Sequence, residues 1–151
     1  MKTISKITVG IFIGMMMSLV ISSCAKDDQY QKHIEGVWKI HRIDGTSYEN
    51  GKEMGTSISE NNNTDLTFDF KSDGTLIEYD DTIGRPDEPI NWKIENGKII
   101  FNTMVSYGEY VTSVCDILEL KKSSMILSFS DEYDWDGIHY KTVYKIYFSR
   151  K

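Results

Sequence analysis

The sequence predicts an all-β protein, an antiparallel up-and-down β-barrel of about eight strands. Three observations predict it. β-branched and aromatic residues recur in short alternating runs from residue 37 to residue 149, Gly, Asn and Asp separate these runs, and each run has one apolar face. Eight antiparallel strands with a common inner face can close on themselves and leave no exposed edge. A two-sheet β-sandwich would explain the same periodicity and is the alternative.

Residues 1–23 have the features of a signal peptide. Lys2 and Lys6 precede an apolar run over residues 7–21, which is too short for a comfortable membrane span. The following Ile21-Ser22-Ser23-Cys24 is similar to the lipobox of bacterial lipoproteins. That resemblance implies that Cys24 carries the lipid and is the first residue of the mature chain. An ordinary signal peptide with an incidental cysteine, or a short anchor helix, is the alternative.

The residues after Cys24 bear on where the protein works. Ala25-Lys26-Asp27-Asp28 resembles a signal with which one group of Gram-negative bacteria sends lipoproteins to the outer face of the outer membrane. This resemblance implies a lipid-anchored protein exposed on the cell surface, with the periplasmic face as the alternative. We expect residues 24–35 to form a lipidated polar tether, ending in a short helical turn, and residues 36–151 to form the barrel.

Composition excludes some classes of function. Removing the two leader lysines from the 17 basic residues leaves 15 against 23 acidic residues, a net charge of −8. An acidic protein has no electrostatic reason to bind nucleic acid, so no such partner is expected. Cys24 and Cys115 are the two cysteines. With Cys24 lipidated, Cys115 is expected to be a buried, inert thiol.

The strands can be placed from alternation and turn residues. The clearest covers residues 65–71, where Leu66, Phe68 and Phe70 share one face. If Asp73-Gly74 is a two-residue turn, Phe70 faces Ile77 and Phe68 faces Tyr79; a bulge at Gly74 would turn Leu76 and Glu78 inward instead. The first register buries no glutamate and is preferred. The other expected runs are residues 37–43, 75–80, 90–95, 98–104, 110–120, 125–130 and 139–149.

Asn96-Gly97 predicts a tight hairpin that places Phe101 opposite Trp92. A slip in alternation between Cys115 and Leu120 predicts a bulge or bend. The hydrophilic residues 44–64 are either a flexible lid or contain one weak strand near residues 57–59. Residues 131–137 are expected to form an acidic loop.

Gly36-Val37-Trp38 at the start of the first strand is similar to the Gly-x-Trp motif of lipocalins. Residues 34–150 resemble bacterial lipocalin-like lipoproteins, which implies a barrel that binds a ligand or is filled by side chains. Lipocalins place a basic residue of the last strand over that tryptophan. By this resemblance Gly36, Trp38 and Arg150 are structural, and Arg150 is expected to make a cation–π contact with Trp38 of about 0.5–2 kcal/mol.

No motif for catalysis or a cofactor is present. His33, His41 and His139 do not have metal-ligand spacing, and no nucleophile elbow, phosphate loop or zinc-protease helix occurs. The acidic loop lacks the carboxylate that a calcium loop needs, since Val143 stands at that position. We therefore expect a protein that is not an enzyme and has no cofactor and no metal.

The barrel interior is the candidate ligand site, because eight-stranded barrels are either filled or hold one small ligand. A small apolar or amphipathic ligand would contact aromatic side chains, with the hydroxyls of Tyr140 and Tyr144 as polar partners. The alternative is a filled barrel that binds a protein or glycan through its loops, with Trp135 as the anchor. The residues expected to line the interior are Trp38, Phe68, Phe70, Tyr79, Trp92, Phe101, Phe129, Tyr140 and Tyr144.

Overall fold

The computed structural model describes residues 26–60, 66–80, 85–86, 88–106 and 109–151. Residues 26–34 are helical, and the strands form one ten-stranded sheet. No helix within these described ranges is long and apolar enough to cross a membrane. The strands are β1 (Gly36–Glu49), β2 (Lys52–Glu60), β3 (Leu66–Phe70), β4 (Thr75–Asp80), β5 (Arg85–Pro86), β6 (Ile90–Glu95), β7 (Lys98–Ser106), β8 (Glu109–Leu120), β9 (Ser124–Trp135) and β10 (Ile138–Arg150).

Eight of these strands close into an antiparallel barrel. The order runs β1-β3-β4-β6-β7-β8-β9-β10, and β10 pairs with β1 to complete the circle. β2 is an extra strand beside the second half of β1, and the short β5 pairs with β4. The predicted all-β, up-and-down barrel is confirmed, and the two-sheet sandwich is not found.

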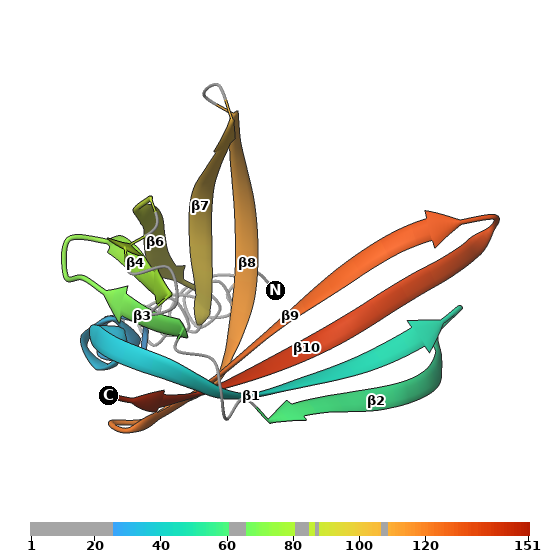
Figure 1. Ribbon diagram of the computed structural model, residues 1–151, viewed down its shortest axis with the longest axis horizontal. Helices are drawn as coiled ribbons and strands as arrows, with labels where there is room; N and C mark the ends of the chain where they lie inside the picture. Colours follow the sequence, from blue (N-terminus) through green and yellow to red (C-terminus); the bar gives the residue numbers. More distant parts are fainter. Residues whose placement is uncertain (1–25, 61–65, 81–84, 87, 107–108) are drawn as a thin grey trace, which may run out of the picture.

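The sheet is closed at one end only. β8 and β9 pair from Asp116 to Leu120, and the rest of β8 pairs with β7 alone. β9 and β10 continue together as far as Trp135 and Ile138. We call residues 42–60 and 129–146, the outer parts of β1, β9 and β10 together with β2, the arm. In Figure 1 the arm projects away from the barrel, and the β7–β8 hairpin projects in a different direction.

Large side chains fill the closed end of the barrel. Trp38, Ile99 and Met125 are fully buried. The rings of Phe70 and Trp92 meet edge to face, with 5.3 Å between their centroids. The indole N–H of Trp92 donates to the Thr75 carbonyl oxygen at 2.9 Å, so this buried polar group is satisfied.

The helix over residues 26–34 packs against the barrel. Ile34 is fully buried in the core, and its carbonyl oxygen accepts a hydrogen bond of 2.6 Å from the Trp38 indole N–H. At the other end of the helix, the Asp27 carboxylate accepts the backbone N–H groups of Asn96 and Gly97, both at 2.8 Å. The segment expected to be a polar tether therefore contributes to the fold.

The preferred register after Asp73-Gly74 is wrong. Phe70 pairs with Leu76 and Phe68 with Glu78, which is the alternative register, the one predicted for a bulge at Gly74. The Asp73 carboxylate accepts both the backbone N–H and the hydroxyl of Thr75, at 2.9 and 2.6 Å. These bonds hold a longer turn and shift β4 by one residue, which exchanges its two faces.

Two segments expected to be loops are strands. Residues 44–60 continue β1, turn at Asn50-Gly51 and return as β2. The alternative of a strand near residues 57–59 is therefore confirmed, but the strand is longer than predicted. Residues 131–135 belong to β9, and the chain turns at Asp136-Gly137. Both turns have positive φ at both residues, 48° and 79° in the first and 51° and 76° in the second. The prediction of an acidic loop over residues 131–137 is therefore wrong.

Two finer predictions are confirmed. Asn96 and Gly97 both have positive φ, at 55° and 74°, and Trp92 pairs with Phe101 across the hairpin. The pairing of β8 with β9 is interrupted between Ile117 and Glu119, within the region where the alternation slips.

Candidate functional site

The divergence of β8 from β9 creates a cleft beside the closed end of the barrel. Its volume is about 770 Å³, which lies within the usual size range of small-molecule sites. The two strands that separate form its walls, and β10 contributes one further residue. The lining residues are Thr112, Ser113, Val114, Cys115, Phe129, Ser130, Asp131 and Tyr144.

The apolar side of the cleft is built around one aromatic pair. Phe129 in β9 and Tyr144 in β10 are cross-strand partners, and their rings stack with centroids 4.8 Å apart and planes at 19°. The neighbouring Ser128 hydroxyl donates to the Tyr144 carbonyl oxygen at 2.9 Å. Val114 and Cys115 lie on the opposite wall. These groups offer a flat apolar body a surface on which to stack.

The rim of the cleft is polar. Thr112, Ser113 and Ser130 provide hydroxyls, and Asp131 provides a carboxylate. The Thr112 hydroxyl already donates to the side chain of Asn102 in β7, at 2.9 Å. An apolar wall with a few polar groups at one side suits a ligand that has an apolar body and a polar end.

A smaller cleft of about 340 Å³ adjoins the first and shares Val114, Phe129 and Ser130 with it. It also contacts two lysines, and both are already paired. Lys98 lies 2.7 Å from Asp116, and Lys141 lies 2.6 Å from Glu132. The smaller cleft is thus surrounded by charges that balance one another.

Cys115 lies at the junction between the filled core and the cleft. It is a free cysteine, about 9% exposed. Burial, with a smaller effect from the neighbouring Asp116 carboxylate, raises the pKa of its thiol to about 11. A thiol with such a pKa carries little thiolate at neutral pH, so Cys115 is a poor nucleophile and acts as a small apolar side chain.

Eight of the nine candidate interior residues divide into four groups. Trp38, Phe70 and Trp92 are buried in the filled core. Phe68 and Phe101 pack against that core and are half-buried. Phe129 and Tyr144 line the cleft. Tyr140 lies on the arm, where it stacks on Tyr133 with centroids 5.2 Å apart.

The expectation that Tyr79 faces the interior is wrong. It pairs with Thr67, on the opposite face of the sheet from Phe68 and Phe70, because β4 is shifted by one residue. Sequence reasoning also missed the β8 wall of the cleft, from Thr112 to Cys115. The available signal was that residues 110–120 form a run longer than the partner residues 125–130, so part of it had to separate from β9.

The contact expected among the structural residues is confirmed. The Arg150 guanidinium lies over the Trp38 ring, 4.5 Å from its centroid. It also donates to the carbonyl oxygens of Glu35, at 3.0 Å, and of His33. Gly36 has φ of +116°, and a Cβ there would lie 2.9 Å from the Arg150 Nη1 atom, so glycine is needed for the close approach. Cys24 lies outside the described residues.

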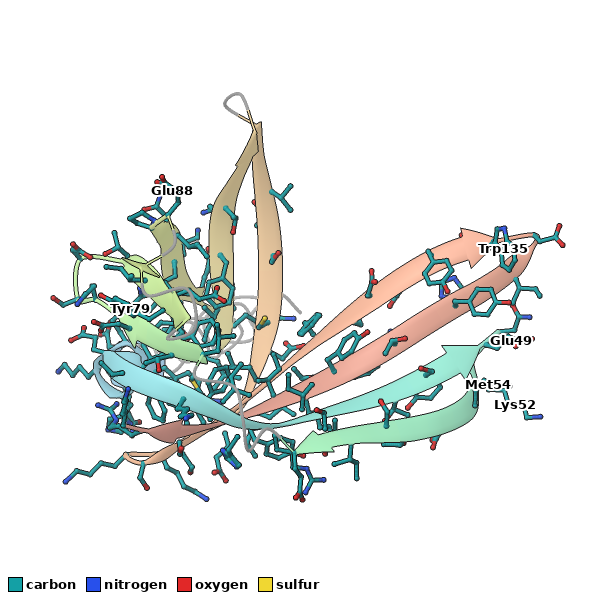
Figure 2. The ribbon with its side chains drawn as sticks, viewed as in Figure 1. Glu49, Lys52, Met54, Tyr79, Glu88 and Trp135 are labelled. Carbon is teal, nitrogen blue, oxygen red and sulfur yellow. The ribbon has the colours of Figure 1, made fainter. Side chains whose placement is uncertain are left out.

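The tip of the arm carries exposed aromatic residues. Trp135 is 70% exposed and Tyr133 is 58% exposed, and Figure 2 shows Trp135 at the far end of the β9–β10 hairpin. On the other face of this hairpin His139 Nδ1 lies 2.8 Å from an Asp134 carboxylate oxygen, but both side chains are largely exposed. Among the described residues, no group of three or more His, Cys, Asp or Glu is placed to hold a metal ion.

The fold and the cleft together define a class of protein, a small up-and-down β-barrel that is filled at one end and open along one seam. A family model described as "Lipocalin-like domain" matches residues 34–127. The match covers more than half of the chain, so the chain belongs to the lipocalin-like domain family. Comparisons with curated proteins and with solved structures found no match. A lipocalin-like barrel is compatible with ligand binding or with a structural role.

Proposed function

We propose that this protein is a non-enzymatic binding lipoprotein, held in the outer membrane by lipid on Cys24 and exposed on the cell surface. In this proposal it holds a small amphipathic ligand in the cleft between β8 and β9. The observation that carries the binding is the cleft of about 770 Å³ with the stacked Phe129–Tyr144 pair as its wall. The lipobox-like sequence supports the anchor.

Side chains fill the closed end of the barrel, and this determines where a ligand can bind. Trp38 and Trp92 occupy the closed end, and both indole N–H groups donate to backbone carbonyl oxygens. Displacing them would leave buried donors unpaired, at a cost of about 1–3 kcal/mol each. A ligand therefore binds beyond the core, where the strands separate.

The chemistry of the cleft limits the ligand. An apolar ring or chain would stack on Phe129 and Tyr144 and bury their exposed faces. A hydroxyl, amine or other donor at one end of the ligand would reach the Asp131 carboxylate. We thus favour an amphipathic molecule with a donor or cationic end over an anionic one.

Native mass spectrometry of the full chain, purified in mild detergent from its own host, tests the binding. We expect a stoichiometric extra mass that is lost on unfolding. Tyr144→Ala is expected to lose this mass, because it removes half of the stacked pair. Tyr140→Ala is the matched control, since Tyr140 lies in the same strand and also stacks on a β9 ring, but outside the cleft. Equal retention of the mass by both variants would contradict the proposed site.

The anchor has a separate test. The intact mass of the purified chain should show cleavage before Cys24 and two or three acyl chains, and Cys24→Ala should abolish both. Protease added to intact cells should digest the protein if it faces outward, whereas a protected protein would favour the periplasmic face. Neither result depends on the ligand.

A second candidate function is a surface module that binds a protein or glycan through the arm. It is favoured by the exposed Trp135 and Tyr133, because an exposed aromatic patch in a monomer usually marks an interaction site. Two results together would favour this function over ligand binding in the cleft. The chain would show no added mass after incubation with a lipid extract, and it would bind a partner that the Trp135→Ala variant does not bind.

A further inference from the structure

The outer edge of β2 is a free strand edge of unusual composition. β2 pairs with β1 alone, and all nine of its residues are exposed. Figure 1 shows β2 on the outer side of the arm, with no described strand beyond it. Its unpaired backbone groups form a template on which another strand can pair.

Proteins usually protect such an edge with charges, prolines or a very short strand. The free half of β9 follows this rule, because Asp131, Glu132 and Asp134 lie within it. β2 does not: the six residues from Met54 to Ser59 contain no charge and no proline. The bulge in β2 is at Met54, at the end of this stretch next to the turn. The edge of β2 is therefore left open to pairing while the edge of β9 is protected.

The side chains of β2 show what would pair with it. Met54 and Ile58 are 60% and 58% exposed. Ile58 is two residues from Thr56 and shares its face of the strand, on which the Thr56 hydroxyl contacts that of Thr46 at 3.2 Å. Directly opposed residues of an antiparallel pair share a face. If two copies of β2 pair about a two-fold axis at Thr56, Met54 of each copy meets Ile58 of the other. Gly55 then meets Ser57, and Lys52 of one copy lies at the same end as Glu60 of the other.

We infer that the protein forms a two-fold symmetric homodimer through its β2 edges, in antiparallel register with Thr56 opposite Thr56. Isologous interfaces of this kind are the commonest in soluble oligomers. Main-chain hydrogen bonds supply the association, as in other cases of strand addition to a sheet edge. The self-complementary order Met54-Gly55-Thr56-Ser57-Ile58 supplies the register. The two arms then form one eight-stranded sheet.

Substitutions of single residues on and away from the two-fold axis of the dimer test this inference. Thr56→Lys places two like charges against each other and should raise the dimer dissociation constant at least about tenfold. Thr46→Lys is the matched control, because Thr46 is the neighbour of Thr56 on the same face but lies in β1, away from the edge. Met54→Glu combined with Ile58→Lys should keep the dimer, since opposite charges then meet.

The measurement is the molar mass of the full chain in mild detergent, by light scattering coupled to gel filtration, over roughly 1–100 µM protein. In a Cys115→Ser background, Thr56→Cys should form an intermolecular disulfide on mild oxidation. Ser57→Cys should not, because Ser57 and its own copy would be diagonal neighbours, roughly 7–8 Å apart. A monomer throughout the range overturns the inference. A dimer that persists in Thr56→Lys, or equal cross-linking of both cysteine variants, also overturns it.

Discussion

Gly36→Ala tests the link between the first and last strands. Gly36 has φ of +116°, a conformation that costs a residue with a Cβ about 1–3 kcal/mol. The new Cβ would also lie 2.9 Å from the Arg150 Nη1 atom and displace the guanidinium. That displacement weakens a cation–π contact of about 0.5–2 kcal/mol, for which the lower part of the range applies because Arg150 is exposed. Together these effects predict a loss of about 2–4 kcal/mol.

Denaturant unfolding followed by circular dichroism measures this loss. Gly97→Ala is the control, because Gly97 also has positive φ, +74°, but has open space around it. We expect about 1–2 kcal/mol there, from the backbone alone. In an Arg150→Ala background, Gly36→Ala should cost less than in the parent, because the collision is gone. The reasoning fails if the two glycine variants lose the same stability, or if Arg150→Ala leaves the cost at Gly36 unchanged.

Three further outcomes are expected. The hydrogen bonds from Arg42 hold the pKa of the Asp44 carboxyl below its usual range, so the pair stabilises the fold above about pH 4 and this contribution is lost as pH falls through the lowered pKa. Asp44→Asn should therefore flatten the fall of Tm in acid, and an unchanged slope would contradict this. Asp27→Ala should cost about 1 kcal/mol in denaturant unfolding, since the turn loses two hydrogen bonds, whereas Asp28→Ala should cost nothing measurable. Cys115 should react with a thiol reagent at pH 8 much more slowly in the native protein than in denaturant, and equal rates would refute the burial of its thiol.

Local rules predicted the fold where one dipeptide determines the geometry. Asn96-Gly97 set both the turn and the opposition of Trp92 to Phe101. The same rule applied to Asn50-Gly51 and Asp136-Gly137 would have found the arm. The charged and polar residues around these two turns resemble loop sequence and obscure the strands, although Tyr133 and Trp135 alternate with acidic residues as they do in a strand.

The register of β4 shows a different limit. Whether Asp73-Gly74 forms a short or a long turn depends on where the Asp73 carboxylate finds its donors. It takes the backbone N–H and the hydroxyl of Thr75, and these two bonds outweigh the preference for keeping Glu78 away from Phe68. The pattern of apolar residues alone does not contain this information.

The candidate site was harder to predict than the fold. Of the nine aromatic residues expected in the interior, Trp38, Phe68, Phe70, Trp92 and Phe101 belong to or pack against the core and Phe129 and Tyr144 line the cleft, whereas Tyr140 lies on the arm and Tyr79 on the opposite face of the sheet. Which of them fill the core and which line the cleft depends on where β8 leaves β9, after Asp116 and Ser128. That divergence is a property of the whole sheet, so Phe129 and Tyr144 do not differ in sequence pattern from Phe101 or Phe70.

The attachment of the helix over residues 26–34 has a consequence for how the protein sits on a surface. Its first turn is bound to the β6–β7 turn through Asp27, and its last turn is buried through Ile34. Lys26, the first described residue of the helix, is two residues after Cys24, so their Cα atoms lie at most about 7 Å apart. With lipid on Cys24, as proposed, only a very short linker would separate the barrel from the membrane. Its tilt against the bilayer would then be set by the helix, and each copy would present the same side outward.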